Sequence, residues 1–175
     1  MRHLPTALVV VVGCTTPTGG VNNIGGYPLV SNDISYTEGI CPNDLACLVV
    51  TISDVTGACD LQVSTHSSNA LSRNSSFATF ELYAPSGVPS PIPLGTYPIS
   101  ANLGVTQASV VTFYSLNSAC AGAFQAVARR GRVTLSGNST ITVDYDADFG
   151  IGTLTGAVTA VPCVVEADTG TPYCN

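Results

Sequence analysis

The sequence predicts an all-β domain, an antiparallel β-sandwich or small β-barrel of about eight strands stapled by disulfides. Three observations support this fold class. Apolar and polar residues alternate along several short segments, Gly, Pro and Asn residues separate those segments, and seven cysteines occur in 175 residues. We assign residues 41–175 to this domain, which is long enough to bury its own core.

The first half of the domain predicts three strands. Residues 48–53 alternate aliphatic and smaller side chains and end in a turn at 54–57, and residues 59–64 predict a short second strand. Residues 65–76 are polar and predict a loop, whereas 77–83 alternate again. Four prolines between 85 and 93 exclude a central strand there, because proline lacks the backbone N–H of a ladder.

The second half is more regular. Residues 95–99 predict an edge strand and 109–116 a longer one, while the alanine-rich stretch 118–127 predicts a short helix. Val133 and Leu135 begin a further strand. Residues 141–149 and 153–160 predict a hairpin around Gly150-Ile151-Gly152.

The composition limits the partners. Charged residues make up only 9% of the chain, lysine is absent, and the net charge is −6, which becomes −7 if Arg2 is removed. Such a chain repels phosphate backbones, so we expect no nucleic-acid partner. No motif for a cofactor is recognisable, and we expect none.

The N-terminus predicts a secretion signal. Arg2 precedes an uncharged apolar run at residues 7–13, which is too short to span a bilayer, and Cys14 follows. The alternative is a buried N-terminal strand, because four consecutive valines suit the interior of a sheet. The following residues, 14–40, are rich in Gly, Pro, Asn and Thr and predict a flexible tether.

The stretch Val11-Val12-Gly13-Cys14 resembles the lipobox of bacterial lipoproteins, although that family prefers leucine where Val11 stands. The resemblance implies a signal peptide at 1–13, cleavage before Cys14 and lipidation of Cys14. It also implies an outer-membrane or cell-surface location, because Thr15 is not the aspartate that retains such proteins at the inner membrane. The partner implied is therefore the membrane, through the lipid anchor on Cys14.

The domain itself is similar to small β-rich lipoproteins of bacterial surfaces. The similarity lies in the strand, turn and cysteine of residues 52–59, in Gly95-Thr96-Tyr97 and in the closing run from Gly131 to Cys163. It implies a fold and no particular activity.

Removing Cys14 leaves six cysteines, and we expect them to form three disulfides: Cys41, Cys47, Cys59, Cys120, Cys163 and Cys174. Such pairing indicates an oxidising compartment. We favour Cys59–Cys120, since both flank predicted β segments. The other four can pair locally, as Cys41–Cys47 and Cys163–Cys174, or in the nested arrangement Cys47–Cys163 and Cys41–Cys174, which we prefer because it would hide the sheet edges.

His66 is the one histidine that remains after the leader, in a polar stretch with serines on both sides. A surface hydrolase built on His66 is a remote alternative, because no Gly-x-Ser-x-Gly motif accompanies it. We predict no catalytic residue. Asn74 and Asn138 begin matches to the N-glycosylation motif, which would matter only in a eukaryotic source.

Asp144, Asp146 and Asp148 lie on one face of a predicted strand, about 6.7 Å between neighbours. They are a weak candidate for a calcium site, since carboxylates are ligands for hard cations. A solvated strand face gives the same pattern, and we prefer that interpretation. Arg130 or Arg132 would neutralise part of the charge.

The sequence therefore predicts a non-enzymatic surface module with a structural, adhesive or binding role and an unidentified protein or glycan partner. The alternative is a carrier in which Phe80, Leu82, Val143 and Tyr145 line a cavity for a small apolar ligand. Tyrosines could also line a carbohydrate or peptide surface, although they occur more often at core edges.

Overall fold

The computed structural model describes residues 22–41, 44–65, 70–119, 121–137, 140–165 and 173–174. Most of these residues form strands, and one short helix accompanies them. In chain order the elements are β1 (Asn22–Ile24), β2 (Tyr27–Leu29), β3 (Asp33–Cys41), β4 (Leu45–Ser53), α1 (Ala58–Thr65), β5 (Ala70–Leu71), β6 (Ser76–Tyr83), β7 (Gly95–Pro98), β8 (Ala108–Leu116), β9 (Gly122–Val127), β10 (Arg130–Ser136), β11 (Ile141–Asp148), β12 (Thr153–Pro162) and β13 (Tyr173–Cys174).

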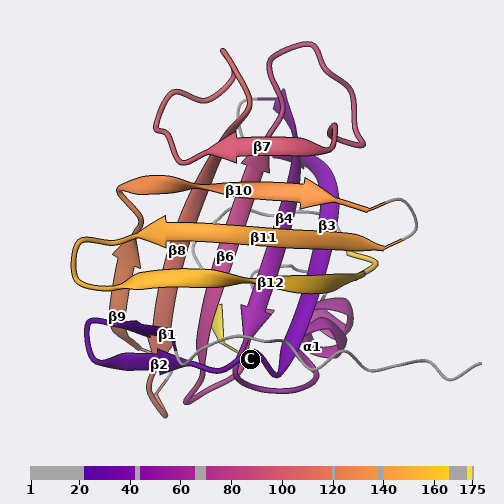
Figure 1. Ribbon diagram of the computed structural model, residues 1–175. Coiled ribbons are helices and arrows are strands. Elements are labelled where there is room, and N and C mark those ends of the chain that lie inside the picture. The colour runs from indigo at the N-terminus through magenta and orange to yellow at the C-terminus, as the bar shows by residue number, and fades with distance from the viewer. Residues whose placement is uncertain are drawn as a thin grey trace, which may run out of the picture.

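Nine strands form one sheet that is bent into two layers, in the order β7-β10-β11-β12-β3-β4-β6-β8-β9. The front layer, β7, β10, β11 and β12, runs across the second layer, β3, β4, β6, β8 and β9 (Figure 1). The layers are continuous because Val161 and Pro162 of β12 pair in parallel with Ser35 and Tyr36 of β3. β1 pairs with β2, and β13 pairs in parallel with β5, as separate small sheets.

The predicted β class is confirmed, but the antiparallel sandwich or barrel of about eight strands is not. The large sheet is mixed, because β12 and β3 run parallel, and it keeps two edge strands, β7 and β9. An isolated parallel bridge between Ile99 and Ser109 brings β7 close to β8 at the other corner. The alternation within a strand carries no information on the pairing of β12 with β3, which joins segments more than a hundred residues apart in sequence.

The hydrophobic core lies between the two layers. Leu48, Val50 and Ile52 of β4 are fully buried or nearly so, and they share the core with Val143 and Tyr145 of the front layer. Successive residues of a strand point to opposite faces, which explains the period of two in the sequence. Six predicted strands contain or overlap observed ones: 48–53 in β4, 77–83 in β6, 109–116 in β8, 133–135 in β10, 141–149 in β11 and 153–160 in β12. The predicted edge strand at 95–99 is β7, which does lie at an edge.

The flexible tether predicted at 14–40 is wrong for its described part, because β1, β2 and β3 fall within it. Gly25 and Gly26 have φ of 61° and 92° and form the tight turn between β1 and β2. The Gly26 N–H donates to Asn23 Oδ1 at 2.8 Å. The folded domain therefore begins no later than Asn22, and residues 14–21 lie outside the described ranges.

The strand predicted at 59–64 is a helix, α1. Its N-terminus is capped from another element, since the Ala58 N–H donates to Asp33 Oδ2 at 2.8 Å. At its C-terminus the hydroxyls of Ser64 and Thr65 donate to the Leu61 carbonyl oxygen at 2.9 and 2.8 Å. A cap that comes from 25 residues away cannot be recognised in the local pattern.

The short helix predicted at 118–127 is also wrong, because residues 122–127 form the edge strand β9 beside β8. Phe124 of β9 stacks on Tyr27, with 4.9 Å between ring centroids. Its packing against the β1–β2 hairpin overrides the preference of alanine for helices. Within the described ranges, no helix is long and apolar enough to cross a membrane.

Candidate functional site

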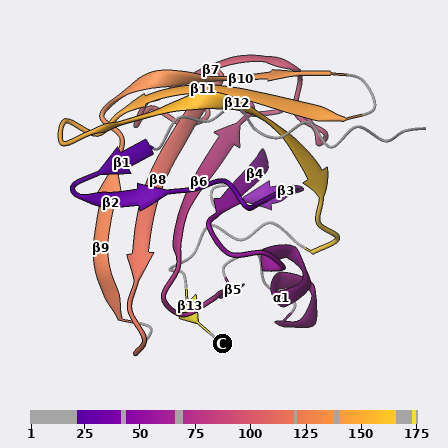
Figure 2. The same ribbon diagram turned by 60° about the horizontal axis from the view of Figure 1, so that its bottom comes forward.

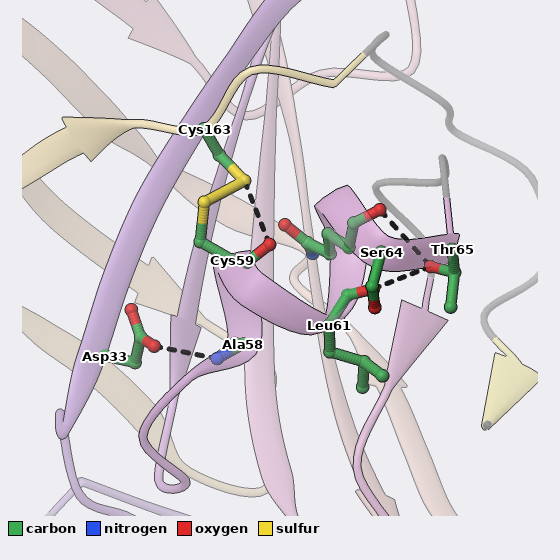
Figure 3. Close-up of a disulfide and its surroundings, with 8 residues drawn as sticks. Asp33, Ala58, Cys59, Leu61, Ser64, Thr65 and Cys163 are labelled. Atoms are coloured by element: carbon green, nitrogen blue, oxygen red, sulfur yellow. Dashed lines mark hydrogen bonds between the residues drawn. A yellow bond between two sulfur atoms is a disulfide. The ribbon is translucent and has the colours of Figure 1, made fainter.

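A disulfide joins the helix to the end of β12 (Figure 3). Cys59 lies in the first turn of α1 and Cys163 directly follows β12, with 5.6 Å between their Cα atoms. Cys163 is buried, and its backbone N–H donates to the Tyr36 carbonyl oxygen at 2.7 Å. The pairing of β12 with β3 therefore brings Cys163 to the helix, beside which β5 and β13 lie (Figure 2).

This bridge corrects the favoured pairing of Cys59 with Cys120 and the nested pairing of Cys47 with Cys163. A second bridge joins Cys41 to Cys47 across the β3–β4 hairpin, with 5.8 Å between their Cα atoms. That bridge is the local alternative, and it excludes the nested link from Cys41 to Cys174. The nested arrangement would hide the sheet edges only if the first and last strands of 41–175 were antiparallel neighbours. Instead, β12 meets β3 in parallel, and Cys163 reaches α1.

The other cysteines stay predictions. Cys14 and Cys120 lie outside the described residues, and of Cys174 only the backbone, in β13, is described. The predicted lipidation at Cys14 therefore has no structural counterpart here. His66 also lies outside the described residues, as do Asn138 and Ser139, whereas Asn74 is exposed in the turn before β6.

The three aspartates of β11 stand on the outer side of the front layer, which faces the viewer in Figure 1. In the register, Arg132 lies opposite Asp146 and Arg130 opposite Asp148. Arg130 forms an ion pair with Asp148, with 2.6 Å between Nη2 and Oδ2. The expected neutralisation by Arg130 is confirmed. A cross-strand ion pair of this kind is common on the solvent-exposed face of a sheet.

Asp148 is also fixed by the following turn. The Gly150 N–H donates to Asp148 Oδ1 at 2.7 Å, and Arg130 Nε donates to Oδ2 at 2.7 Å. The Gly150 hydrogen bond first, and then Arg130, hold the pKa of Asp148 below its usual value. Among the described residues, no group of three or more His, Cys, Asp or Glu side chains is arranged to hold a metal ion.

Hydroxyl groups surround these charges. Thr96 of β7 and Thr134 of β10 lie side by side, with 3.1 Å between their oxygens. Both threonines belong to a larger exposed or half-exposed surface of the front layer, which we call the polar face. It consists of Thr96, Arg130, Arg132, Thr134, Thr142, Asp144, Asp146, Asp148, Thr153, Thr155 and Thr159. This face offers hydrogen-bond donors and acceptors from four adjacent strands.

The residues expected to line a ligand cavity are packed together instead. Phe80, Leu82 and Val143 are fully buried, and Tyr145 is 2% exposed. Phe80 contacts Tyr145, with 5.0 Å between ring centroids. None of the four lines either of the two surface pockets described in this molecule. These four residues therefore belong to the packed hydrophobic core and do not line a cavity.

The other side of the second layer carries the half-buried carboxylate of Glu81 in β6. The hydroxyl of Tyr83 donates to Glu81 Oε2 at 2.7 Å. Burial raises the pKa of Glu81, and the Tyr83 hydrogen bond partly offsets that effect.

The sequence interpretation missed a pocket at the edge of the two layers, where Tyr36 and Glu38 of β3 stand. The signal was present, because Ile34, Tyr36, Glu38 and Ile40 are spaced by two residues. The neighbouring Gly, Pro and Asn residues obscure it, because they give residues 14–40 the composition of a tether. Comparison of the chain with protein-family models, curated proteins and solved structures found no match.

Proposed function

We propose that this protein is a lipid-anchored β module of the bacterial outer membrane or cell surface, with a structural, adhesive or binding role and no enzymatic activity. The observation that carries the proposal is the Cys59–Cys163 bridge, which links residues 104 positions apart. Disulfides that hold a fold together persist in oxidising compartments and are rare in the cytosol. The lipobox-like stretch that ends at Cys14 fits the same location.

The polar face supports the binding role. It presents threonine hydroxyls, three carboxylates and two guanidinium groups on neighbouring strands, which suits hydrogen bonding to a polar protein or glycan partner. The packed contact between Phe80 and Tyr145 favours this role over an interior carrier.

Two variants at the anchor test the location. Cys14→Ser removes the sulfur that the resemblance predicts to be lipidated, so the protein should leave the membrane fraction or keep its leader. Three acyl chains, at about 0.8 kcal/mol for each buried CH₂, hold a protein in lipid almost irreversibly, so the release should be nearly complete. Cell fractionation followed by mass spectrometry measures both outcomes.

Thr15→Asp is the matched variant, because it keeps the cysteine and introduces the residue that the resemblance associates with inner-membrane retention. It should stay membrane-bound and move from the outer-membrane to the inner-membrane fraction. Recovery of the unaltered protein as a soluble species with an unmodified Cys14 would contradict the proposal.

A further inference from the structure

A cavity of about 260 Å³ opens where the two layers separate at one end. One wall comes from the second layer, through Tyr36 and Glu38 of β3 and Leu48 of β4. The opposite wall is formed by Leu135 of β10 and Ile141 of β11, and the loop 91–94 closes one side. β3 and the adjoining ends of β10 and β11 lie on the same side of the molecule (Figure 1).

Glu38 is an unusual residue for its position. In the β3–β4 register it lies opposite Leu48, which is 1% exposed, just as Tyr36 lies opposite the buried Val50. Both β3 side chains therefore stand on the face of the strand that points toward the core. At this end of the strand the front layer no longer covers that face, and the Glu38 carboxylate is left exposed at the cavity.

The charge of Glu38 has no partner within the described ranges. The ion pair there joins Arg130 to Asp148, and no arginine, histidine or lysine lines the cavity. An ammonium ion at the mouth of the cavity would be attracted to the exposed Glu38 carboxylate, and the apolar side chains beside it lower the local dielectric constant. The acidic chain, with a net charge of −6, also draws cations toward its surface.

The volume of the cavity and its apolar lining limit the uncharged part of the ligand. A cavity of about 150 Å³ accommodates benzene, and drug-sized ligands occupy about 300–1,000 Å³. The observed 260 Å³ lies between them and suits one aromatic ring or one branched aliphatic group with a short stem. Leu94, which lines the cavity and is 51% exposed, would lose water contact when such a group binds.

We infer that this cavity binds a small organic ammonium ion, with the charged nitrogen at Glu38 and a single apolar group between Leu48, Leu135 and Ile141. The inference goes beyond the proposed function, because it assigns a ligand class to a site remote from the polar face. It depends on neither the lipid anchor nor the cellular location, so either claim can fail alone.

The test compares three ligands that share one phenyl ring: phenethylamine, 2-phenylethanol and 3-phenylpropionate. Titration of the full chain, followed by calorimetry or by chemical shifts near Glu38, should give the tightest binding for the amine. The amine should bind roughly tenfold more tightly than the neutral alcohol, as expected for a hydrogen bond to a charged group. Added salt should reduce the difference in affinity between the amine and the alcohol, because it screens the charge of Glu38.

Glu38→Gln should remove the preference for the amine and leave the affinity for the alcohol unchanged. Leu94→Ala should weaken all three ligands alike. Glu81→Gln is the matched control, because Glu81 lies on the other side of the sheet, and it should leave amine binding unaltered. Failure of the amine to bind at millimolar concentration, equal binding of amine and alcohol, or unchanged selectivity in Glu38→Gln would each overturn the inference.

Discussion

The buried tyrosines Tyr97 and Tyr145 differ in the hydrogen bonding of their hydroxyl groups. The Tyr97 hydroxyl donates to the Pro93 carbonyl oxygen, and burial raises the pKa of Tyr97 to about 12. Burial also raises the pKa of Tyr145, partly offset by the Ser31 side chain. No hydrogen bond of ordinary geometry joins the buried Tyr145 hydroxyl to a described residue.

Replacing each of these tyrosines by phenylalanine should therefore have different effects. Tyr97→Phe leaves the Pro93 carbonyl without its donor and should lower the free energy of unfolding by about 1 kcal/mol. Tyr145→Phe removes a hydroxyl that lacks such a bond and should change stability by less than about 0.5 kcal/mol. Urea unfolding of the two variants measures the difference, and an equal loss in both would contradict these assignments.

Glu81 should make stability depend on pH. Because burial raises its folded-state pKa, folding favours the protonated form. Its contribution is fully present below the unfolded pKa of about 4.3 and is lost as the pH rises through the folded pKa. At pH 7, Glu81→Gln should therefore raise the free energy of unfolding, by on the order of 1 kcal/mol, and flatten this part of the pH profile.

Glu38→Gln serves as the control for that measurement. Glu38 is exposed, so its replacement should leave the free energy of unfolding at pH 7 nearly unaltered. A Glu81→Gln variant that is less stable at pH 7 than the parent would show that the ionised carboxylate stabilises the fold.

At the scale of the elements, the sequence predicts a strand correctly where apolar and polar residues alternate within it. It does not predict an element whose conformation depends on a contact with a residue distant in sequence. The strands β4, β6 and β11 follow from their own alternation. The helix α1 depends on Asp33 and on the bridge to Cys163, and β9 depends on Tyr27 and β8. A local pattern contains neither contact.

The candidate site shows the same limit. The outward placement of Asp144, Asp146 and Asp148 followed from the period of two, and so did the proximity of Arg130 on the preceding strand. The cysteine pairing did not follow, because spacing alone leaves many connectivities open. Glu38 could be placed only once β3 was known to lie beside β4.

The two disulfides should stabilise the fold unequally. In the chain-entropy model, a bridge across about 100 residues contributes about 4.7 kcal/mol, whereas one across six or seven contributes about 2. The observed separations are 104 residues for Cys59–Cys163 and 6 for Cys41–Cys47. The double variant Cys59→Ala/Cys163→Ala should therefore lose roughly twice as much unfolding free energy as Cys41→Ala/Cys47→Ala.

Chemical denaturation under oxidising conditions measures both losses, with each bridge removed as a pair so that no unpaired thiol is left behind. A larger loss from the Cys41–Cys47 pair would mean that native packing at the β3–β4 hairpin, rather than chain entropy, sets the contribution.

At the scale of the molecule, the two layers join into one bent sheet at a seam of two residue pairs, Val161 with Ser35 and Pro162 with Tyr36. The Cys59–Cys163 bridge lies immediately beyond that seam and fastens it to α1. The bridge adds a covalent link to the hydrogen bonds between β12 and β11, and such a link persists in an oxidising compartment. The proposed cell-surface location and the architecture therefore depend on the same bond.

The most direct test of this account is non-reducing peptide mapping, by mass spectrometry, of the protein extracted from its native membranes. We predict peptides linked through Cys59–Cys163 and Cys41–Cys47, and an N-terminal peptide that begins at a lipidated Cys14. Because Cys120 and Cys174 are the two that remain of the six cysteines expected to pair, we also predict a link between them. Free thiols at Cys59 and Cys163 in the native protein, together with an unmodified Cys14, would contradict the claim that it is a disulfide-stapled, lipid-anchored module outside the cytoplasm.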